Sequence, residues 1–180
     1  AGMKASDVTL VNTATNDTPQ TLSSGEVAAI GAWYPVSSQA LKAVANSKAI
    51  YTSADAPGLI YDVLAVNPTS LAKRKADWEK YVAVYYKCVD YILDPKTQDD
   101  AVAILAAKVG AKPADYKAPF PVPNSFTLKE AQKVLKKGPG LDSLYGSLTI
   151  SNQFSLDNNV YKESQKAESY VAPSILNAKK

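Results

Sequence analysis

The chain has 180 residues, a net charge of +3, 46% hydrophobic residues and 21% charged residues, which are ordinary values for a soluble globular protein of about one domain. It contains no histidine and a single cysteine, and no stretch approaches the roughly 20 apolar residues of a membrane span. These facts exclude Ser-His-Asp and Cys-His catalysis within the chain, an internal disulfide, and a zinc site built from several thiolates.

The first third of the chain alternates between strand-like and helix-like segments. A helix is expected from Thr18, where a hydroxyl followed by Pro19 marks a helix start, to Gly25, and another from Val36 to Val44. Apolar or β-branched runs predict four strands, at residues 8–11, 27–33, 48–52 and 59–66. Strands and helices that alternate in this way predict an α/β fold with a parallel sheet.

After Asn67 the patterns become helical, and this shift is the clearest boundary in the chain. A long amphipathic helix follows and ends at Asp94, before a proline. Its apolar stripe consists of Leu71, Trp78, Val82, Tyr85, Val89 and Ile92. The same helix carries Cys88, for which we expect a buried structural thiol.

Two further helices are predicted by their capping residues. Thr97 with Asp100 forms a loose capping box for the first, and Thr127 with Glu130 forms a capping pair for the second. A proline-rich link, residues 113–123, separates them, and the tail after the second helix is expected to form short helices and turns.

The basic residues form no stripe with interleaved aromatic residues, which is the pattern typical of a nucleic-acid surface. The densest cluster, Lys73-Arg74-Lys75, is followed at once by Asp77 and Glu79. This mixture of charges indicates a solvated helix face, and we expect no nucleic acid among the partners.

Three segments, taken in order, resemble the periplasmic solute-binding proteins of ABC importers of the nitrate/sulfonate/taurine type. The first is Asp7–Asn12 (DVTLVN), which leads into a polar loop and the Thr18-Pro19 helix start. The second, Ser24–Pro35 (SGEVAAIGAWYP), is similar to the family's strand that runs into a tryptophan and a proline. The third, Thr52–Leu64 (TSADAPGLIYDVL), looks like the loop and crossover strand by which the second lobe returns to the first.

The resemblance implies a partial type II periplasmic-binding-protein-like fold, with a parallel-sheet lobe followed by a mainly helical C-terminal portion. Residues 1–62 would be part of the second α/β lobe. Residues 63–180 would be the crossover strand and the helical portion that returns to the first lobe. Family members have a whole first lobe before the point where this chain begins. We therefore expect a missing N-terminal lobe or a second chain to complete the cleft.

The function implied by the resemblance is extracytoplasmic binding of a small anionic or zwitterionic solute, such as a sulfonate, taurine or nitrate, without enzymatic activity or a cofactor. The partners would be that solute and an ABC permease, and the location the periplasm or the outer face of the cytoplasmic membrane. Two positions depart from the family pattern: Ala28 replaces an acidic residue, and Tyr34 replaces a glutamate after the tryptophan. Because of these departures, the resemblance does not name the solute.

Five residues are candidates for ligand binding, because solutes of such proteins lie beyond the carboxyl ends of the strands. Asn12 and Thr13 offer an amide and a hydroxyl, although both residue types are also common in turns. Trp33 and Tyr34 offer a flat apolar wall with a polar tip, or core packing at a strand end. Asp62, near the predicted hinge, could receive an amine or pair locally.

Two other functions remain open. The related thiamine-pyrimidine enzymes share the family's fold, but they depend on histidine, which this chain lacks. Alternatively, the chain acts as a truncated half-receptor, a structural or interaction module that associates with a partner chain through exposed apolar surface.

Overall fold

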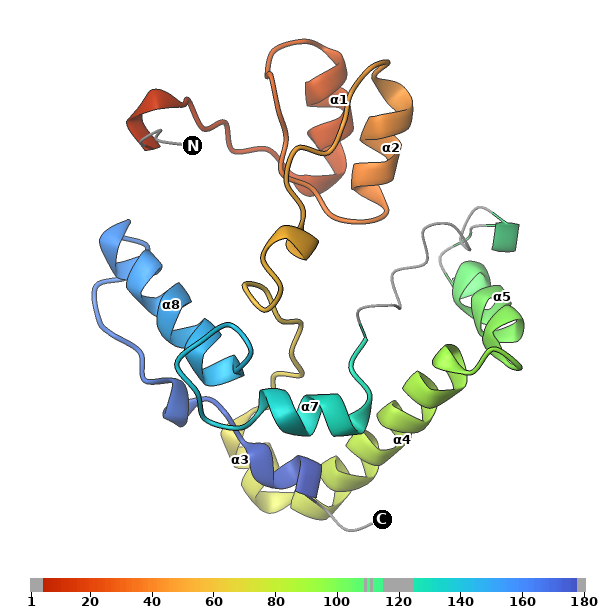
Figure 1. The fold of residues 1–180 in the computed structure, drawn as a ribbon, viewed down its shortest axis with the longest axis vertical. Helices are drawn as coiled ribbons and strands as arrows, with labels where there is room; N and C mark the ends of the chain where they lie inside the picture. Colours follow the sequence, from red (N-terminus) through yellow and green to blue (C-terminus); the bar gives the residue numbers. More distant parts are fainter. Residues whose placement is uncertain (1–4, 109, 111, 115–124, 178–180) are drawn as a thin grey trace. The chain divides into compact units, whose positions relative to one another are not determined.

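Helices and turns make up the described parts of the chain, shown in Figure 1 as a computed structural model. The structure describes residues 5–108, 110, 112–114 and 125–177. The chain divides into an N-terminal unit, residues 1–51, and a C-terminal unit, residues 52–180. The positions of the two units relative to one another are not determined, so each is described by itself.

The N-terminal unit is built on two short helices, α1 (Thr18–Ser23) and α2 (Val36–Ala43), with the single turns η1 (Ala5–Asp7) and η2 (Thr15–Asp17) before them. The two helices lie side by side (Figure 1) and pack against each other. The side chains that this contact buries are Thr18, Val36 and Ala40. A core of three small or medium side chains makes this unit a weakly stabilised structure.

Helix α1 begins and ends close to where its sequence predicts. Pro19 stands in the first turn, and Gly25 follows the helix with φ +76°, a left-handed conformation that glycine adopts at little cost. Thr18, however, does not cap the helix: its buried hydroxyl donates to the Thr15 carbonyl (2.7 Å), inside the preceding turn. The residue before the helix is Asp17, whose side chain makes no cap hydrogen bond.

The predicted parallel sheet is wrong, because the described residues contain no strand at all. All four segments predicted as strands are irregular, and most of their large apolar side chains face solvent: Leu10 is 87% exposed, Ile50 80% and Ile60 73%. A β-branched, apolar run favours an extended backbone, but a strand also needs a neighbour for its N–H and C=O groups. In this structure the helices pack on one another, and no segment supplies that neighbour among the described residues.

The C-terminal unit is organised around its longest helix, α4. That helix contacts α3, α5 and η6, while α7 contacts η6 and α8 contacts η5. In chain order the elements are η3 (Ser53–Asp55), α3 (Pro68–Lys73), α4 (Lys75–Leu93), α5 (Gln98–Lys108), α7 (Leu128–Val134), α8 (Leu144–Asp157), η5 (Ala167–Ser169) and η6 (Pro173–Asn177). The buried apolar side chains of the unit are Val89, Ala101, Val102, Ala106, Tyr145, Ala167 and Ile175.

The long helix predicted after Asn67 is present, but it is divided. Asn67 caps α3 by accepting hydrogen bonds from the backbone N–H of Thr69 (2.9 Å) and Ser70 (3.2 Å). The helix then breaks at Arg74, whose φ is −129°, and resumes as α4 until Asp94. Trp78 links the two pieces, since its indole N–H donates to the Ser70 hydroxyl (3.2 Å).

The predicted capping box at the start of α5 is not formed. The Thr97 hydroxyl instead donates back to the carbonyls of Tyr91 and Asp94, and Asp100 accepts a hydrogen bond from the Tyr91 hydroxyl (2.7 Å). That hydrogen bond is the main reason why the pKa of Tyr91 is raised. These contacts tie α5 to α4, and α5 buries Val102, which is 2% exposed. The proline-rich link lies mainly outside the described residues, which include only 113 and 114 of it.

The predicted capping box of α7 is confirmed. Thr127 and Glu130 bond reciprocally: the Thr127 N–H donates to the Glu130 carboxylate (2.8 Å), and the Glu130 N–H donates to the Thr127 hydroxyl (3.4 Å). The pKa of Glu130 is lowered, chiefly because the Thr127 hydroxyl also donates to its carboxylate. The box sets the start of a short helix whose last residue is Val134.

Candidate functional site

The aromatic pair Trp33–Tyr34 lies at the end of an irregular segment, directly before α2. The Trp33 carbonyl accepts a hydrogen bond from the Ser37 N–H (3.0 Å), and the Tyr34–Pro35 peptide bond is cis. The Trp33 side chain is 68% exposed, whereas Tyr34 is half-buried. Of the two alternatives for Trp33, core packing is therefore excluded within the N-terminal unit, and an exposed aromatic wall remains.

Asn12 and Thr13 lie in the irregular segment before η2, where Asn12 is exposed and Thr13 half-buried. No hydrogen bond between described residues involves either side chain. The helix that follows η2, α1, has only six residues, so its N-terminus adds little to anion binding here. The structure places both residues in the same unit as Trp33 but shows no contact that joins them into one site.

Asp62 belongs to the C-terminal unit, where it is exposed in the irregular segment before α3. Its neighbour Tyr61 is anchored: the Tyr61 hydroxyl donates to the Leu141 carbonyl (2.7 Å). The pKa of Tyr61 is raised by burial first and by the charge of Asp142 second. The five predicted ligand residues are thus distributed over two units.

The other acid of this region, Asp55, has a structural role. Its carboxylate accepts hydrogen bonds from the N–H (2.6 Å) and the hydroxyl (2.9 Å) of Thr52, which closes the turn η3. The backbone hydrogen bond is the larger cause of the lowered pKa of Asp55. Cys88, predicted to be buried, is exposed on α4, so its thiol does not belong to the core.

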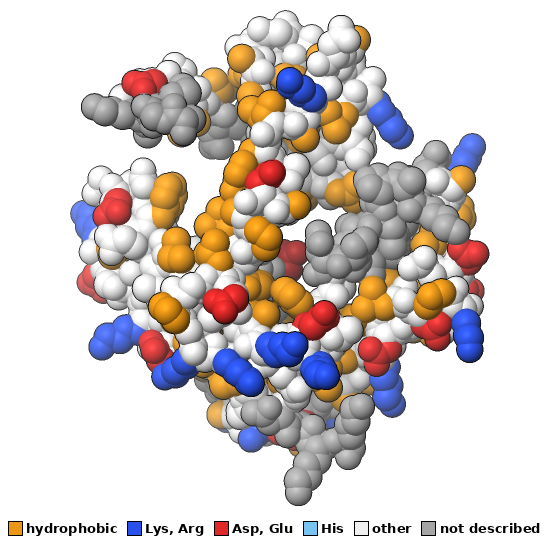
Figure 2. All heavy atoms as spheres, viewed as in Figure 1, with side chains coloured by type: hydrophobic (Ala, Val, Ile, Leu, Met, Phe, Trp, Pro, Cys, Tyr) orange, Lys and Arg blue, Asp and Glu red, His pale blue; other side chains and the backbone are white. Residues whose placement is uncertain are grey.

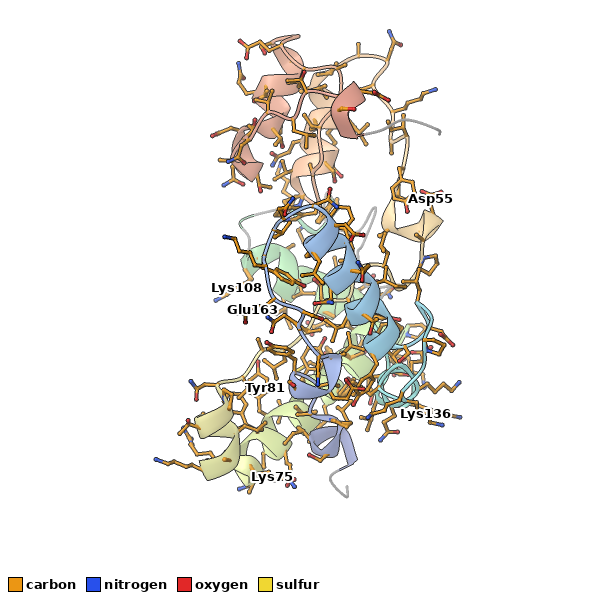
Figure 3. All side chains as sticks on the ribbon, turned by 90° about the vertical axis from the view of Figure 1, so that its left-hand side faces the viewer. Asp55, Lys75, Tyr81, Lys108, Lys136 and Glu163 are labelled. Carbon is orange, nitrogen blue, oxygen red and sulfur yellow. The ribbon has the colours of Figure 1, made fainter. Side chains whose placement is uncertain are left out.

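A pocket that the sequence did not indicate lies between α7 and η6, with a volume of about 340 Å³. We call it the α7–η6 pocket; its lining residues are Gln132, Leu135, Lys136, Pro173 and Leu176. Its two sides are joined by a hydrogen bond, because the Gln132 side-chain amide donates to the Leu176 carbonyl (2.9 Å). Lys136 lies beside the α7 segment, as labelled in Figure 3.

Lysines are concentrated around this pocket. Lys129 and Lys133 lie on α7, one turn apart, and Lys136 and Lys137 follow its end. Lys137 pairs with Glu168 (3.6 Å), and its ammonium group lies 5.6 Å from the centre of the Tyr145 ring. The Lys136 side chain forms no hydrogen bond or ion pair with a described residue, so its charge is available to a ligand.

Within the described ranges, no group of three or more Cys, Asp or Glu side chains is placed to hold a metal ion. None of the described helices has the length and apolar character needed to span a bilayer. The structure therefore offers two candidate sites, the Trp33–Tyr34 pair and the α7–η6 pocket.

Comparisons with models of known protein families, with curated proteins and with solved structures find no match to this chain. The resemblance to the solute-binding proteins consequently stays a prediction that rests on the three quoted segments.

Proposed function

We propose that the chain is part of an extracytoplasmic receptor that binds a small anionic or zwitterionic solute, such as a sulfonate, taurine or nitrate, for an ABC importer. The observation that carries the proposal is the exposed indole of Trp33, at the position where the resemblance expects a solute-facing tryptophan. Tryptophan is a large residue that folded chains rarely leave two-thirds exposed without a use.

The residues around Trp33 suit such a solute. An indole face offers van der Waals contact to a short carbon chain, while hydroxyl and amide groups donate hydrogen bonds to an anionic headgroup. Asn12 and Thr13 are the candidates for those donors, since both precede α1 in the same unit. The permease, the extracytoplasmic location and the lack of enzymatic activity enter the proposal through the resemblance alone.

Replacing Trp33 by alanine is expected to weaken solute binding at least tenfold, which corresponds to about 1.4 kcal/mol. The reason is the loss of the aromatic wall. Isothermal titration calorimetry measures the affinity of the unmodified chain and of Trp33→Ala. A fluorescence titration of Trp78→Phe, in which Trp33 is the single tryptophan, reports binding at the indole itself. The panel contains taurine, ethanesulfonate, nitrate and the neutral analogue ethanol.

The matched control is Ile50→Ala, which removes an apolar side chain that is 80% exposed in the same unit. It should leave both the titration and the thermal unfolding of the chain unchanged. If no anion of the panel changes the Trp33 emission in a saturable manner, the pair is not a solute site and the proposed ligand class is wrong.

A second function, that of an interaction module, is favoured by α4. One side of this helix packs inward through Val82 and Val89, which are half-buried and 4% exposed. A neighbouring side exposes large side chains: Tyr81 is 52% exposed, Val84 58% and Tyr85 51%. A surface helix ordinarily has one apolar stripe, which faces the core. A second, exposed apolar side next to that stripe indicates that a partner molecule covers it.

Apolar side chains reach the surface at several other places (Figure 2), including Val63 and Leu64 in the segment before α3. In the absence of another partner, the chain is expected to associate with itself. The measured mass in native mass spectrometry should then exceed the 19.2 kDa of one chain. Val84→Glu should shift the population toward the single chain, because a buried carboxylate is costly.

The control for this experiment is Ala83→Glu, which adds the same charge at an exposed position one residue away, on a different side of α4. It should leave the mass distribution as it is in the unmodified chain. A strictly monomeric chain at concentrations of tens of micromolar would contradict the interaction module.

A further inference from the structure

We propose that the α7–η6 pocket binds a small organic anion, a carboxylate or sulfonate group joined to a short apolar body. The pocket lies in the C-terminal unit, and the proposal goes beyond the solute site proposed around Trp33 in the N-terminal unit. It rests on three properties of the pocket: its size and mixed lining, a lysine that pairs with no described residue, and the contacts that hold its walls.

The size and the lining suit a small ligand. A volume of about 340 Å³ lies at the lower end of the range for small-molecule sites, so the apolar body has room for only a few carbon atoms beyond the charged group. Leu135, Pro173 and Leu176 supply the apolar surface for that body. Polar atoms make up almost half of the lining surface, which suits a ligand that carries a charged group on a short apolar body.

The charge of the pocket is positive and largely uncompensated. Lys136 lines it without a partner among the described residues, and Lys133 lies three residues earlier, in the last turn of α7. Two of the acids nearby are already engaged: Glu130 in the capping box with Thr127, and Glu168 with Lys137. A third, Asp142, lies six residues after Lys136, and its charge acts on Tyr61. An anion at Lys136 therefore meets attraction from a lysine whose charge no described carboxylate pairs directly.

The walls of the pocket are held by hydrogen bonds from both directions. Gln132 joins α7 to η6 through the Leu176 carbonyl, and the Ser143 hydroxyl donates to the Lys136 carbonyl (2.6 Å). The second bond fixes the backbone of the lysine just after α7 ends. Because the pocket exists before a ligand arrives, binding needs little reorganisation.

Lysines near the end of a helix also have a simpler role, since positive charge there interacts favourably with the helix dipole. In that role Lys136 would matter for stability and not for any ligand. The experiment therefore has to separate binding from folding, and it has to distinguish charge recognition from non-specific adsorption of an apolar chain.

The test is an NMR titration of the isotope-labelled full chain with hexanoate and hexanesulfonate, with hexanol and hexylammonium as neutral and cationic probes. We expect saturable shifts of the backbone amides of Leu135, Lys136 and Leu176 with both anions. A dissociation constant in the millimolar range is ordinary for a ligand of about eight heavy atoms. Hexanol should bind at least tenfold more weakly, and hexylammonium should produce no saturable shift at these amides.

Lys136→Gln should weaken hexanoate binding at least fivefold while leaving the thermal midpoint of the chain within the error of the unmodified protein. Lys129→Gln, which removes a lysine of α7 that does not line the pocket, is the matched control and should change binding less than twofold. Equal affinity for hexanol and hexanoate would overturn the proposal. So would an unchanged affinity in Lys136→Gln, or shifts that concentrate on α4 instead of the pocket.

Discussion

Gly146→Ala is expected to destabilise the C-terminal unit by at least about 2 kcal/mol, although the same change inside a helix usually stabilises a protein by up to about 1 kcal/mol. Gly146 lies in the first turn of α8 and is buried. A Cβ atom at this position would overlap the Gly140 carbonyl oxygen, and it would lie 2.6 Å from the Pro139 carbonyl carbon and 2.7 Å from the Gly140 nitrogen. All three are backbone atoms, so no side-chain rotation relieves the overlap.

The free energy of unfolding, measured by urea denaturation followed by circular dichroism, checks this expectation. Ser151→Ala is the control, because it also introduces alanine into α8, but at an exposed position and without replacing a glycine. It should raise the stability slightly, by a few tenths of a kcal/mol through helix propensity. A Gly146→Ala variant as stable as the unmodified chain would show that the loop at 139–140 does not pack against α8 as described.

Gly58→Ala is the second substitution with a large expected effect, a loss of about 3 kcal/mol from the stability of the C-terminal unit. Gly58 has φ +83°, a left-handed backbone that is strained for alanine. Its Cβ would also overlap the Leu141 carbonyl oxygen and lie 2.9 Å from the Tyr61 hydroxyl. Because that hydroxyl donates to the same carbonyl, the substitution disrupts the hydrogen bond as well.

A control in the same unit separates the backbone strain of a positive φ from the overlap of the new Cβ with the Leu141 carbonyl oxygen. Gly110 also has a positive φ, +68°, but a Cβ there would have no neighbour within 4 Å among the described residues. Gly110→Ala should therefore cost about 1 kcal/mol, the strain alone. Urea unfolding of both variants gives the comparison, and equal losses would mean that Leu141 does not approach Gly58 closely.

Gly58 and Gly146 contact the same stretch of chain, residues 139–141, although they are 88 residues apart in the sequence. A substitution at either glycine displaces this loop. Once the loop has moved, the Cβ atom of the second substitution overlaps it less. The double variant should therefore lose less unfolding free energy than the sum of the two single losses. Such a result would show that one loop links the irregular segment before α3 to the start of α8.

The local features of the fold could be predicted from the sequence where neighbouring residues decide them. Thr127 and Glu130 form the predicted capping box, and the helical region begins at the predicted Pro68. Both predictions hold because a cap satisfies backbone groups three residues away, and no distant segment is needed. The capping box predicted at Thr97 failed, because Tyr91 of the preceding helix offered its carbonyl and its hydroxyl to the same two side chains.

For the candidate sites too, the sequence indicated what neighbouring residues decide and missed what distant residues decide. Trp33 and Tyr34 were identified as candidates because they precede a proline in the chain, but the strand predicted to end at Trp33 is absent, and the sequence left core packing open for it. The α7–η6 pocket could not be predicted, because Gln132 and Leu176 are 44 residues apart and no periodic pattern connects them. The spacing of the lysines from Lys129 to Lys137 was the only signal near it, and that spacing alone describes a charged surface and not a pocket.

The sequence by itself determined the absence of histidine chemistry and the positions of most helix ends, because each depends on composition or on residues within one helical turn. Only the tertiary structure decided the fold class, the exposed surface of α4 and the pocket between α7 and η6. A strand, a buried face and a cavity each need a second segment that lies against the first, and which segment that is depends on packing across the whole unit.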